Sequence, residues 1–152
     1  MGPLHGVKII EMAGIGPGQF CGMLLADLGA EVLRMERPEP EPTGFDIPEP
    51  FNLMNRGRSR LAVDLKSEEG RELVLELCAP ADALFEGFRP GAMERLGLGP
   101  DDCMARNPAL VYGRMTGWGQ DGPLAPRAGH DANYVALSGF MSLLAGADGE
   151  PL

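Results

Sequence analysis

The apolar residues of this chain fall into short runs, separated by segments in which they recur every three or four positions. Five runs have the length and the bounding residues of buried strands: 7–12, 31–36, 61–65, 83–86 and 110–115. The segments between them predict helices over 20–28, after Ser67, over 93–96 and over 101–106. Strands that alternate with helices predict an α/β fold with a Rossmann-like, mostly parallel sheet and flanking helices.

Two of these helices carry an apolar stripe that predicts their buried face. The stripe of the first helix consists of Phe20, Met23, Leu24 and Leu28. The stripe of the second helix consists of Leu73, Val74 and Leu77. Ser67 is a suitable N-cap for the second helix, and Gly29 is a suitable stop for the first. We expect both stripes to pack on the sheet.

Composition and charge narrow the possible functions. A chain of 152 residues with 44% hydrophobic and 23% charged residues has ordinary globular values and is long enough for one domain with a core. The net charge of −9 argues against a nucleic-acid partner. No apolar run approaches the ~18 residues of a membrane span, and the start has no signal-peptide pattern. We therefore expect a cytoplasmic protein that does not bind membranes.

The three cysteines are widely spaced and lie outside any CxxC pattern: Cys21, Cys78 and Cys103. That spacing favours reduced thiols that serve packing over a metal site. We therefore expect no bound metal.

The loop after the first predicted strand has glycine at every second position over 14–18, and Glu36 ends the second strand about twenty residues later. This half-fingerprint is typical of dinucleotide-binding enzymes, in which the acid holds a ribose. Two residues count against that interpretation. Gln19 stands where the third glycine belongs, and Pro17 lacks the N–H that a phosphate cradle would use. A nicotinamide or flavin enzyme stays as a minor alternative.

Positive charge is concentrated in one short segment of this acidic chain: Arg56, Arg58, Arg60 and Lys66. The concentration predicts either a local anion site or a solvated loop. Residues 38–50, just before it, are rich in proline and glutamate. They predict a surface loop that is mobile until a ligand binds.

A Gly/Pro-rich loop, residues 116–129, leads into a run in which apolar residues again recur at helical spacing, so His130 falls at a helix start. The unpaired N–H groups and partial positive charge of a helix N-terminus attract anions and favour a neutral histidine. His130 is therefore a candidate neutral base beside a small oxyanion hole. The alternative is that His130 and Asp131 only cap the helix.

Short motifs are spread along the whole chain: 3–11, 14–18, 27–32, 55–58, 64–66, 86–91, 116–120 and 129–131. In this order they resemble the family III CoA-transferase superfamily (CaiB/BaiF type), and within it the α-methylacyl-CoA racemases. The resemblance implies that residues 1–152 are the CoA-binding, Rossmann-like domain of a larger enzyme. It also implies a small domain and an interlocked homodimer in the full-length form.

The residues that the resemblance implies for CoA binding are Arg37, Asn55, Arg56, Arg58, Gly87, Phe88, Arg89 and Gly129. Arg37 would contact the adenosine phosphate end, where the fixed fork of a guanidinium matches phosphate oxygens. The segment 55–58 would wrap the nucleotide, and 87–89 would border the adenine and pantetheine channel. CoA would enter as part of an acyl-CoA substrate, and no prosthetic group is expected.

The implied reaction inverts the α-carbon of a 2-methylacyl-CoA through an enolate. The implied catalytic residues are His130 and Asp131: His130 would take the proton from one face, while the start of the Asp131 helix would stabilise the enolate oxygen. Inversion needs a second acid on the opposite face. In the family that acid is an aspartate in a Gly-Asp-Phe-Gly-type loop, which is absent here, and the motifs give the role to none of Asp131, Asp148 and Glu150. We therefore expect an N-terminal portion with little or no racemase activity by itself.

Two other functions stay open. A CoA-transferase of the same superfamily would use a carboxylate nucleophile to form an acyl-enzyme anhydride. Transferases generally carry a non-basic residue at the position of His130, so this histidine favours the racemase. The other alternative is a CoA-binding module without catalysis.

Overall fold

The computed structural model describes residues 2–39, 48–146 and 149–150. The chain divides into two compact units, residues 1–115 and 116–152, and each is described by itself. The expected mobile loop at 38–50 lies largely outside the described residues, as does Asp148. None of the helices in the described ranges combines the length and apolar character that a bilayer crossing requires.

The first unit is built on a parallel sheet of five strands: β1 (Lys8–Met12), β2 (Glu31–Glu36), β3 (Ser59–Ala62), β4 (Ala83–Glu86) and β5 (Val111–Arg114). Their order across the sheet is β3-β2-β1-β4-β5. The chain first winds outward from β1 to β3 and then crosses to β4 on the other side of β1. This doubly wound arrangement confirms the predicted α/β class, and its switch point lies between β1 and β4.

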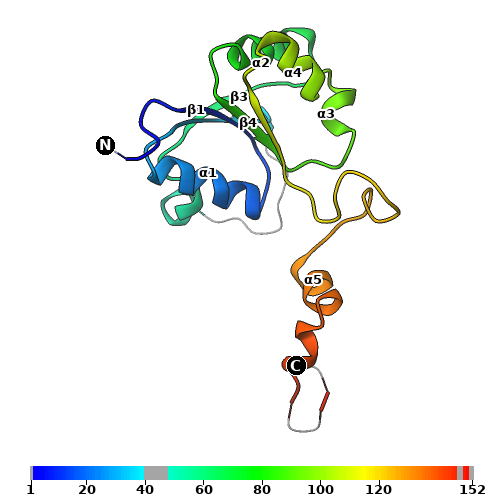
Figure 1. Cartoon of the computed structure of the whole chain (residues 1–152). Helices are drawn as coiled ribbons and strands as arrows, with labels where there is room; N and C mark the ends of the chain where they lie inside the picture. Colours follow the sequence, from blue (N-terminus) through cyan, green and yellow to red (C-terminus); the bar gives the residue numbers. More distant parts are fainter. Residues whose placement is uncertain (1, 40–47, 147–148, 151–152) are drawn as a thin grey trace. The chain divides into compact units, whose positions relative to one another are not determined.

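Helices cover both faces of the sheet (Figure 1). Helix α1 (Pro17–Asp27) lies on one face, and α2 (Glu68–Cys78), α3 (Ala92–Arg95) and α4 (Pro100–Arg106) lie on the other. Two short 3-10 turns, η1 (Glu49–Phe51) and η2 (Leu53–Asn55), follow the undescribed segment, and η2 packs against α1. The predicted helices are therefore all present, with starts that differ by up to three residues.

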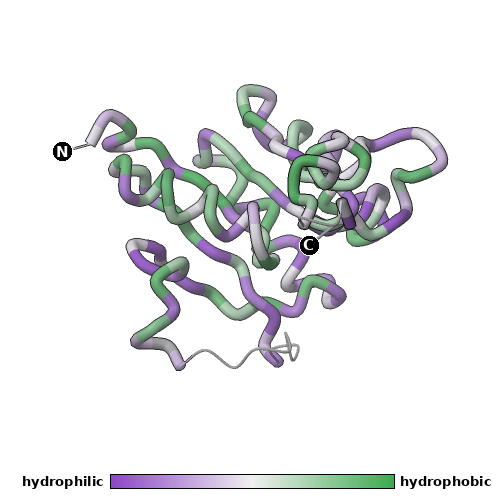
Figure 2. The backbone as a smooth tube through the Cα atoms, turned by 90° about the horizontal axis from the view of Figure 1, so that it is seen from below, coloured by the Kyte–Doolittle hydropathy of each residue, from purple (hydrophilic) through white to green (hydrophobic). Residues whose placement is uncertain are grey.

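The main core lies between the sheet and the α2–α4 layer. Its fully buried side chains come from both: Val74, Cys78, Leu84, Met93, Leu98 and Cys103. A smaller cluster of Ile9, Ala30 and Val32 lies on the α1 face. Neighbouring strand residues such as Ile9 and Ile10 enter different clusters because successive side chains point to opposite faces. Green, apolar stretches accordingly run through the helices and strands in Figure 2.

Helix α1 does not bury the stripe that the sequence predicts. Met23 is buried, but Phe20, Leu24 and Leu28 are 49%, 42% and 44% exposed. The helix turns its small side inward instead, because a β-carbon on Gly22 would stand 2.1 Å from an oxygen of Glu11. The helix therefore faces the sheet with Gly22, which leaves space for the buried carboxylate of Glu11.

Two smaller differences concern α2 and β3. In α2, Ser67 caps the helix as predicted, its Oγ accepting from the Gly70 N–H at 2.9 Å. Val74 is buried, but Leu73 is 37% exposed, so its place in the buried stripe is wrong. Strand β3 lies at Ser59–Ala62 where the sequence predicts 61–65, so it begins two residues and ends three residues earlier than predicted. At its start, Arg60 pairs in register with Arg34 and donates to Glu36. The ion pair extends the strand into a polar stretch that the apolar pattern misses.

The second unit contains α5 (Asp131–Leu137) and the 3-10 turn η3 (Phe140–Leu143). Helix α5 begins where the sequence predicts, with His130 as the N-cap residue. Among the residues described in this unit, only Ala125 is buried, while Leu137, Phe140 and Leu143 are 70%, 52% and 75% exposed.

Candidate functional site

The candidate site lies at the carboxyl edge of the sheet, where ligands of open α/β sheets bind. Strands β2, β1 and β4 are neighbours and parallel, so their following segments leave from the same edge. These segments begin with Arg37 after β2, with the loop of Gly14 after β1, and with Gly87 after β4. The order of the strands therefore brings three of the predicted motifs to the same edge of the sheet.

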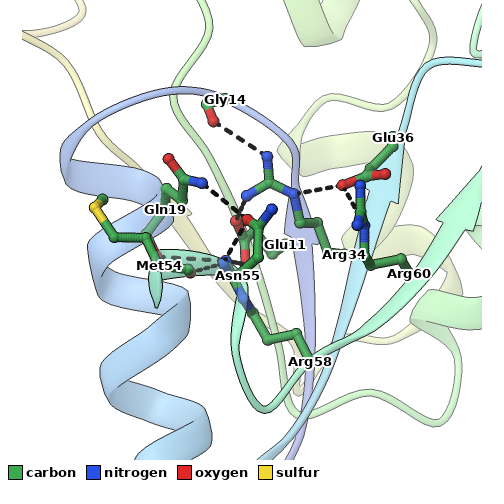
Figure 3. Close-up of polar contacts among 9 residues, drawn as sticks. All are labelled: Glu11, Gly14, Gln19, Arg34, Glu36, Met54, Asn55, Arg58 and Arg60. Carbon is green, nitrogen blue, oxygen red and sulfur yellow. Dashed lines mark hydrogen bonds and ion pairs between the residues drawn. The ribbon is translucent and has the colours of Figure 1, made fainter. Parts of the chain in front are cut away.

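A buried ion cluster lies under the loop that follows β1 (Figure 3). Glu11 is 0% exposed, and each of its carboxylate oxygens accepts from a different arginine. Arg34 Nη1 donates to Oε1 at 2.8 Å, and Arg58 Nη1 donates to Oε2. Burial raises the pKa of Glu11, against the opposing effect of Arg58 and Arg34.

The cluster continues across the sheet to β3. Glu36 Oε1 accepts from Nε of Arg34 and from Nε of Arg60, both at 2.9 Å. Burial acts to raise the pKa of Glu36, but the two guanidiniums outweigh it and hold that pKa below its usual range. With both carboxylates ionised, the three arginines leave one positive charge in excess on a chain of net charge −9. This edge can therefore attract an anion.

The same side chains fix the backbone around the site. Arg34 Nη2 reaches the carbonyl of Gly14 at 3.4 Å. Arg58 donates to the carbonyls of Gln19, at 3.3 Å, and of Met54. The amide oxygen of Asn55 accepts from Arg58 at 3.2 Å and from the Gln19 side chain at 2.8 Å. The loop after β1, the start of α1 and η2 are thus joined through one carboxylate.

A second buried carboxylate shapes the segment after β4. Glu86 is 4% exposed, and its Oε2 accepts from the backbone N–H of Phe88 at 2.6 Å. Burial raises the pKa of Glu86, and the Phe88 N–H and Arg114 oppose that rise. Arg114 also pairs with Glu94 and lies 5.5 Å from the ring centre of Tyr112. The turn at Gly87 and Phe88 is therefore fixed by a hydrogen bond to the buried carboxylate of Glu86.

In the second unit, His130 is exposed at the start of α5. Its backbone N–H donates to Oδ1 of Asn133 at 3.0 Å, and its imidazole makes no capping hydrogen bond. The alternative in which His130 and Asp131 only cap the helix stays a prediction. A β-carbon on Gly117 or Gly129 would stand 2.2 or 2.1 Å from the Tyr134 hydroxyl. Gly117 and Gly129, which precede the histidine, have no side chain where the Tyr134 hydroxyl lies.

The implied CoA-binding residues of the first unit fall into two groups. Arg37, Gly87 and Arg89 are exposed at the carboxyl edge, and Phe88 is half-buried against the main core. Arg56 is exposed and paired with Asp27, its Nε 3.1 Å from Oδ1. Asn55 and Arg58 come together in the ion cluster, where the Arg58 side chain is 0% exposed.

Sequence reasoning missed the two residues at the centre of the cluster, Glu11 and Arg34. Each occupies a position inside a strand, and the period of two puts both on the same face as Ile9 and Val32. A charged residue among inward-facing apolar ones needs a partner. That pairing of opposite charges on adjacent predicted strands was the available signal.

Comparison with known proteins decides the family. The model of CoA-transferase family III matches residues 4–152. The chain belongs to this family. The family includes racemases and CoA-transferases: the chain is 48% identical to α-methylacyl-CoA racemase of Mus musculus over 97% of its length. It is 37% identical to succinyl-CoA:glutarate CoA-transferase of the same organism over 100% of its length.

The family III fold is also found among solved structures. A CaiB/BaiF family protein from Brucella suis superposes with a TM-score of 0.89 at 38% identity, over 99% of this chain and 43% of that one. The chain spans only 36% of the mouse racemase and 37% of the mouse transferase. A putative β-ketoacyl-ACP reductase superposes with a TM-score of 0.52 at 16% identity, which shows the shared Rossmann-like fold alone.

Proposed function

We propose that this chain is the CoA-binding part of a 2-methylacyl-CoA racemase and supplies its proton-abstracting histidine. The observation that carries the proposal is that the His130 side chain is exposed at the start of α5. The backbone N–H of His130 donates to the Asn133 side chain, and this hydrogen bond does not use the imidazole. Identity of 48% to a mouse α-methylacyl-CoA racemase supports the same choice.

In the proposed complex, the nucleotide end of CoA lies at the carboxyl edge of the sheet. Arg37 is exposed at the end of β2, beside a cluster that carries one positive charge in excess. A guanidinium stays charged at any working pH and can hold two phosphate oxygens at once. Such a site would select a phosphorylated ligand on a chain that is otherwise acidic.

In the proposed reaction, His130 removes the proton from the carbon next to the thioester carbonyl. The electron pair of that C–H bond forms a double bond to the carbonyl carbon, and the C=O π pair moves to the oxygen. The resulting enolate oxygen must be stabilised by hydrogen-bond donors. A second acid then returns a proton to the opposite face of the carbon. That acid is not assigned to Asp131 or Glu150. A homodimer and a cytoplasmic location stay predictions.

Titration with CoA tests the binding half of the proposal. Wild-type chain should bind CoA saturably and less tightly at high salt, since the contacts are charged. Arg37→Ala should cost about 1.5–3 kcal/mol of binding, the usual value of a hydrogen bond to a charged group. Arg106→Ala is the matched control, because this exposed arginine pairs with Glu72 on the α2–α4 layer. Binding of NAD(H) in preference to CoA would overturn the proposal.

A chimera tests the reaction itself. Residues 4–152 would replace the matching segment of the mouse racemase, and a second chimera would use the mouse succinyl-CoA:glutarate transferase. In D₂O, the racemase chimera should incorporate deuterium at the α-carbon of a 2-methylacyl-CoA, and His130→Ala should abolish it. Transferase activity of the second chimera that survives His130→Ala, with no α-deuteration by the first, would favour the CoA-transferase alternative.

A further inference from the structure

The buried cluster around Glu11 is enclosed by the protein, and it contacts the loop after β1, the start of α1 and η2. The Glu11 and Arg58 side chains are 1% and 0% exposed. A phosphate cannot reach a guanidinium that the protein encloses, and the Arg58 amino groups already donate to Glu11, Gln19, Met54 and Asn55. Arg58 is therefore poorly placed to bind CoA directly.

We propose that Glu11 is a positioning residue, which holds the loop after β1 and η2 in the arrangement that receives the nucleotide end of CoA, and that Arg58 acts through it. This inference rests on the proposed function for the identity of the ligand. It assigns the exposed Arg37 to direct phosphate contact and gives Arg58 a different role.

The geometry explains how one carboxylate can set two loops. On one side, Glu11 holds Arg34, whose Nη2 reaches the carbonyl of Gly14. On the other side, it holds Arg58, whose Nη2 donates to Met54 and Asn55 of η2. Ionised side chains make the stronger hydrogen bonds. Among the described atoms of the cluster, buried Arg58 Nε makes no hydrogen bond, so the placement of Arg58 depends on its two amino groups and on Glu11. Loss of the Glu11 charge would therefore loosen both loops together.

The packing of α1 provides a second, independent sign of this role. Gly22 is the helix residue that faces the cluster, and a β-carbon there would lie 2.1 Å from Glu11 Oε2 and 2.8 Å from Arg58 Nη1. The same helix leaves three large apolar side chains exposed: Phe20, Leu24 and Leu28. At this point α1 therefore meets the sheet through a glycine against the ion cluster and not through a large apolar side chain.

The test compares CoA affinity and its salt dependence in Glu11→Gln, Arg58→Lys and Arg37→Ala. Glu11→Gln leaves the cluster with one more positive charge, so long-range attraction of CoA and the salt dependence should not fall. We nevertheless expect CoA binding to weaken about tenfold, because the loops lose their arrangement. Arg58→Lys keeps the charge but cannot make the same set of hydrogen bonds, so it should weaken binding similarly. Arg37→Ala should instead reduce the salt dependence, because it removes a direct phosphate contact.

Val74→Ala is the control for lost stability, since Val74 is a fully buried core residue of α2. All affinities would be measured at a temperature at which circular dichroism shows every variant folded. Amide exchange gives a readout that needs no CoA: Glu11→Gln should speed exchange at Phe20, Asn55 and Arg56 more than Val74→Ala does.

The outcomes separate the two proposals. If wild-type chain does not bind CoA, the proposed function fails, and amide exchange alone then decides whether Glu11 orders these loops. If wild-type chain binds CoA and Glu11→Gln binds as well as Val74→Ala, with no faster exchange, Glu11 has no positioning role. Should Arg58→Lys retain wild-type affinity, Arg58 acts by charge and the inference is wrong.

Discussion

The hydroxyl of Tyr134 lies 2.1 Å from the place that a β-carbon would take on Gly129. The same hydroxyl lies 2.2 Å from the corresponding place on Gly117, so the phenol lies against two glycines. The ring of Trp118 lies against Tyr134 with 5.1 Å between ring centres, and its Nε1 donates to the carbonyl of Ala128 at 3.2 Å. The backbone just before His130 is therefore shaped by an aromatic side chain that follows it.

Gly129→Ala should displace Tyr134 and loosen the start of α5. Tyr134 is 37% exposed, so its ring can turn toward solvent and away from Trp118, and the cost should stay below the value of about 1–3 kcal/mol for overpacking a closed core. The chain has one tryptophan, so its fluorescence reports this unit directly. We expect a red-shifted and more easily quenched emission. Gly18→Ala is the control, because nothing lies within 4 Å of a β-carbon there; an unchanged spectrum in Gly129→Ala would contradict the packing.

Replacing a leucine by alanine should cost much more free energy of unfolding on the α2–α4 side of the sheet than on the α1 side. Leu84 is 0% exposed in the main core, so Leu84→Ala should lower the free energy of unfolding by about 2–5 kcal/mol. Leu24 is 42% exposed on α1, so Leu24→Ala should change it by no more than about 0.5 kcal/mol. Urea unfolding followed by circular dichroism measures both. A large loss in Leu24→Ala would mean that α1 buries the stripe that the sequence predicts.

The sequence predicts the strands and their α/β class well, because apolar runs of strand length are hard to interpret in any other way. It places β2 at Glu31–Glu36 and the start of α5 at His130, as the structure does. It fails for the buried face of α1, since helical periodicity assumes that the largest apolar residues turn inward. Here α1 turns Gly22 toward a long-range ion pair between Glu11 and Arg58, which are 47 positions apart, so the local pattern of the helix carries no signal of it.

The same limit applies to the candidate site. Motif resemblance finds Asn55 and Arg58 but cannot tell a residue that touches the ligand from one that is enclosed. In the structure Arg37 is exposed and the Arg58 side chain is not, and this difference supports, only as a proposal, direct ligand contact for Arg37 alone. Arg34 carries no motif at all in the sequence-based assignment. Its importance follows only once β1 and β2 are paired in register, which sets Glu11 beside it.

Glu36 should give the chain a stability that is lost in acid. Its pKa is lowered in the folded state by Arg60 and Arg34, so the folded chain binds a proton less readily than the unfolded chain. The stabilisation is therefore present above the ordinary carboxyl pKa and disappears as the pH falls through the lowered value. We expect Glu36→Gln to cost about 1–2 kcal/mol at neutral pH and progressively less in acid.

Urea unfolding of Glu36→Gln and wild-type chain across acid to neutral pH measures this difference. Glu68→Gln is the matched control, because the Glu68 side chain is 86% exposed and only 3.9 Å from Arg71. An exposed pair of this kind contributes little. A difference that grows as the pH falls would reverse the sign and rule out the assigned pairing of Glu36.

Glu86 is expected to behave in the opposite way. Burial raises its pKa, so the folded chain holds a proton more readily than the unfolded chain, and the carboxyl favours folding most in acid. This contribution declines as the pH rises through the raised value.

Glu86→Gln keeps an acceptor oxygen for the Phe88 N–H and removes the buried charge, so it should change the free energy of unfolding little above that pH. Glu86→Ala leaves that N–H without its acceptor and should cost about 1–3 kcal/mol. The comparison of the two variants by urea unfolding separates the hydrogen bond from the charge, and equal losses would show that the charge, through Arg114, is what the turn at Gly87 requires.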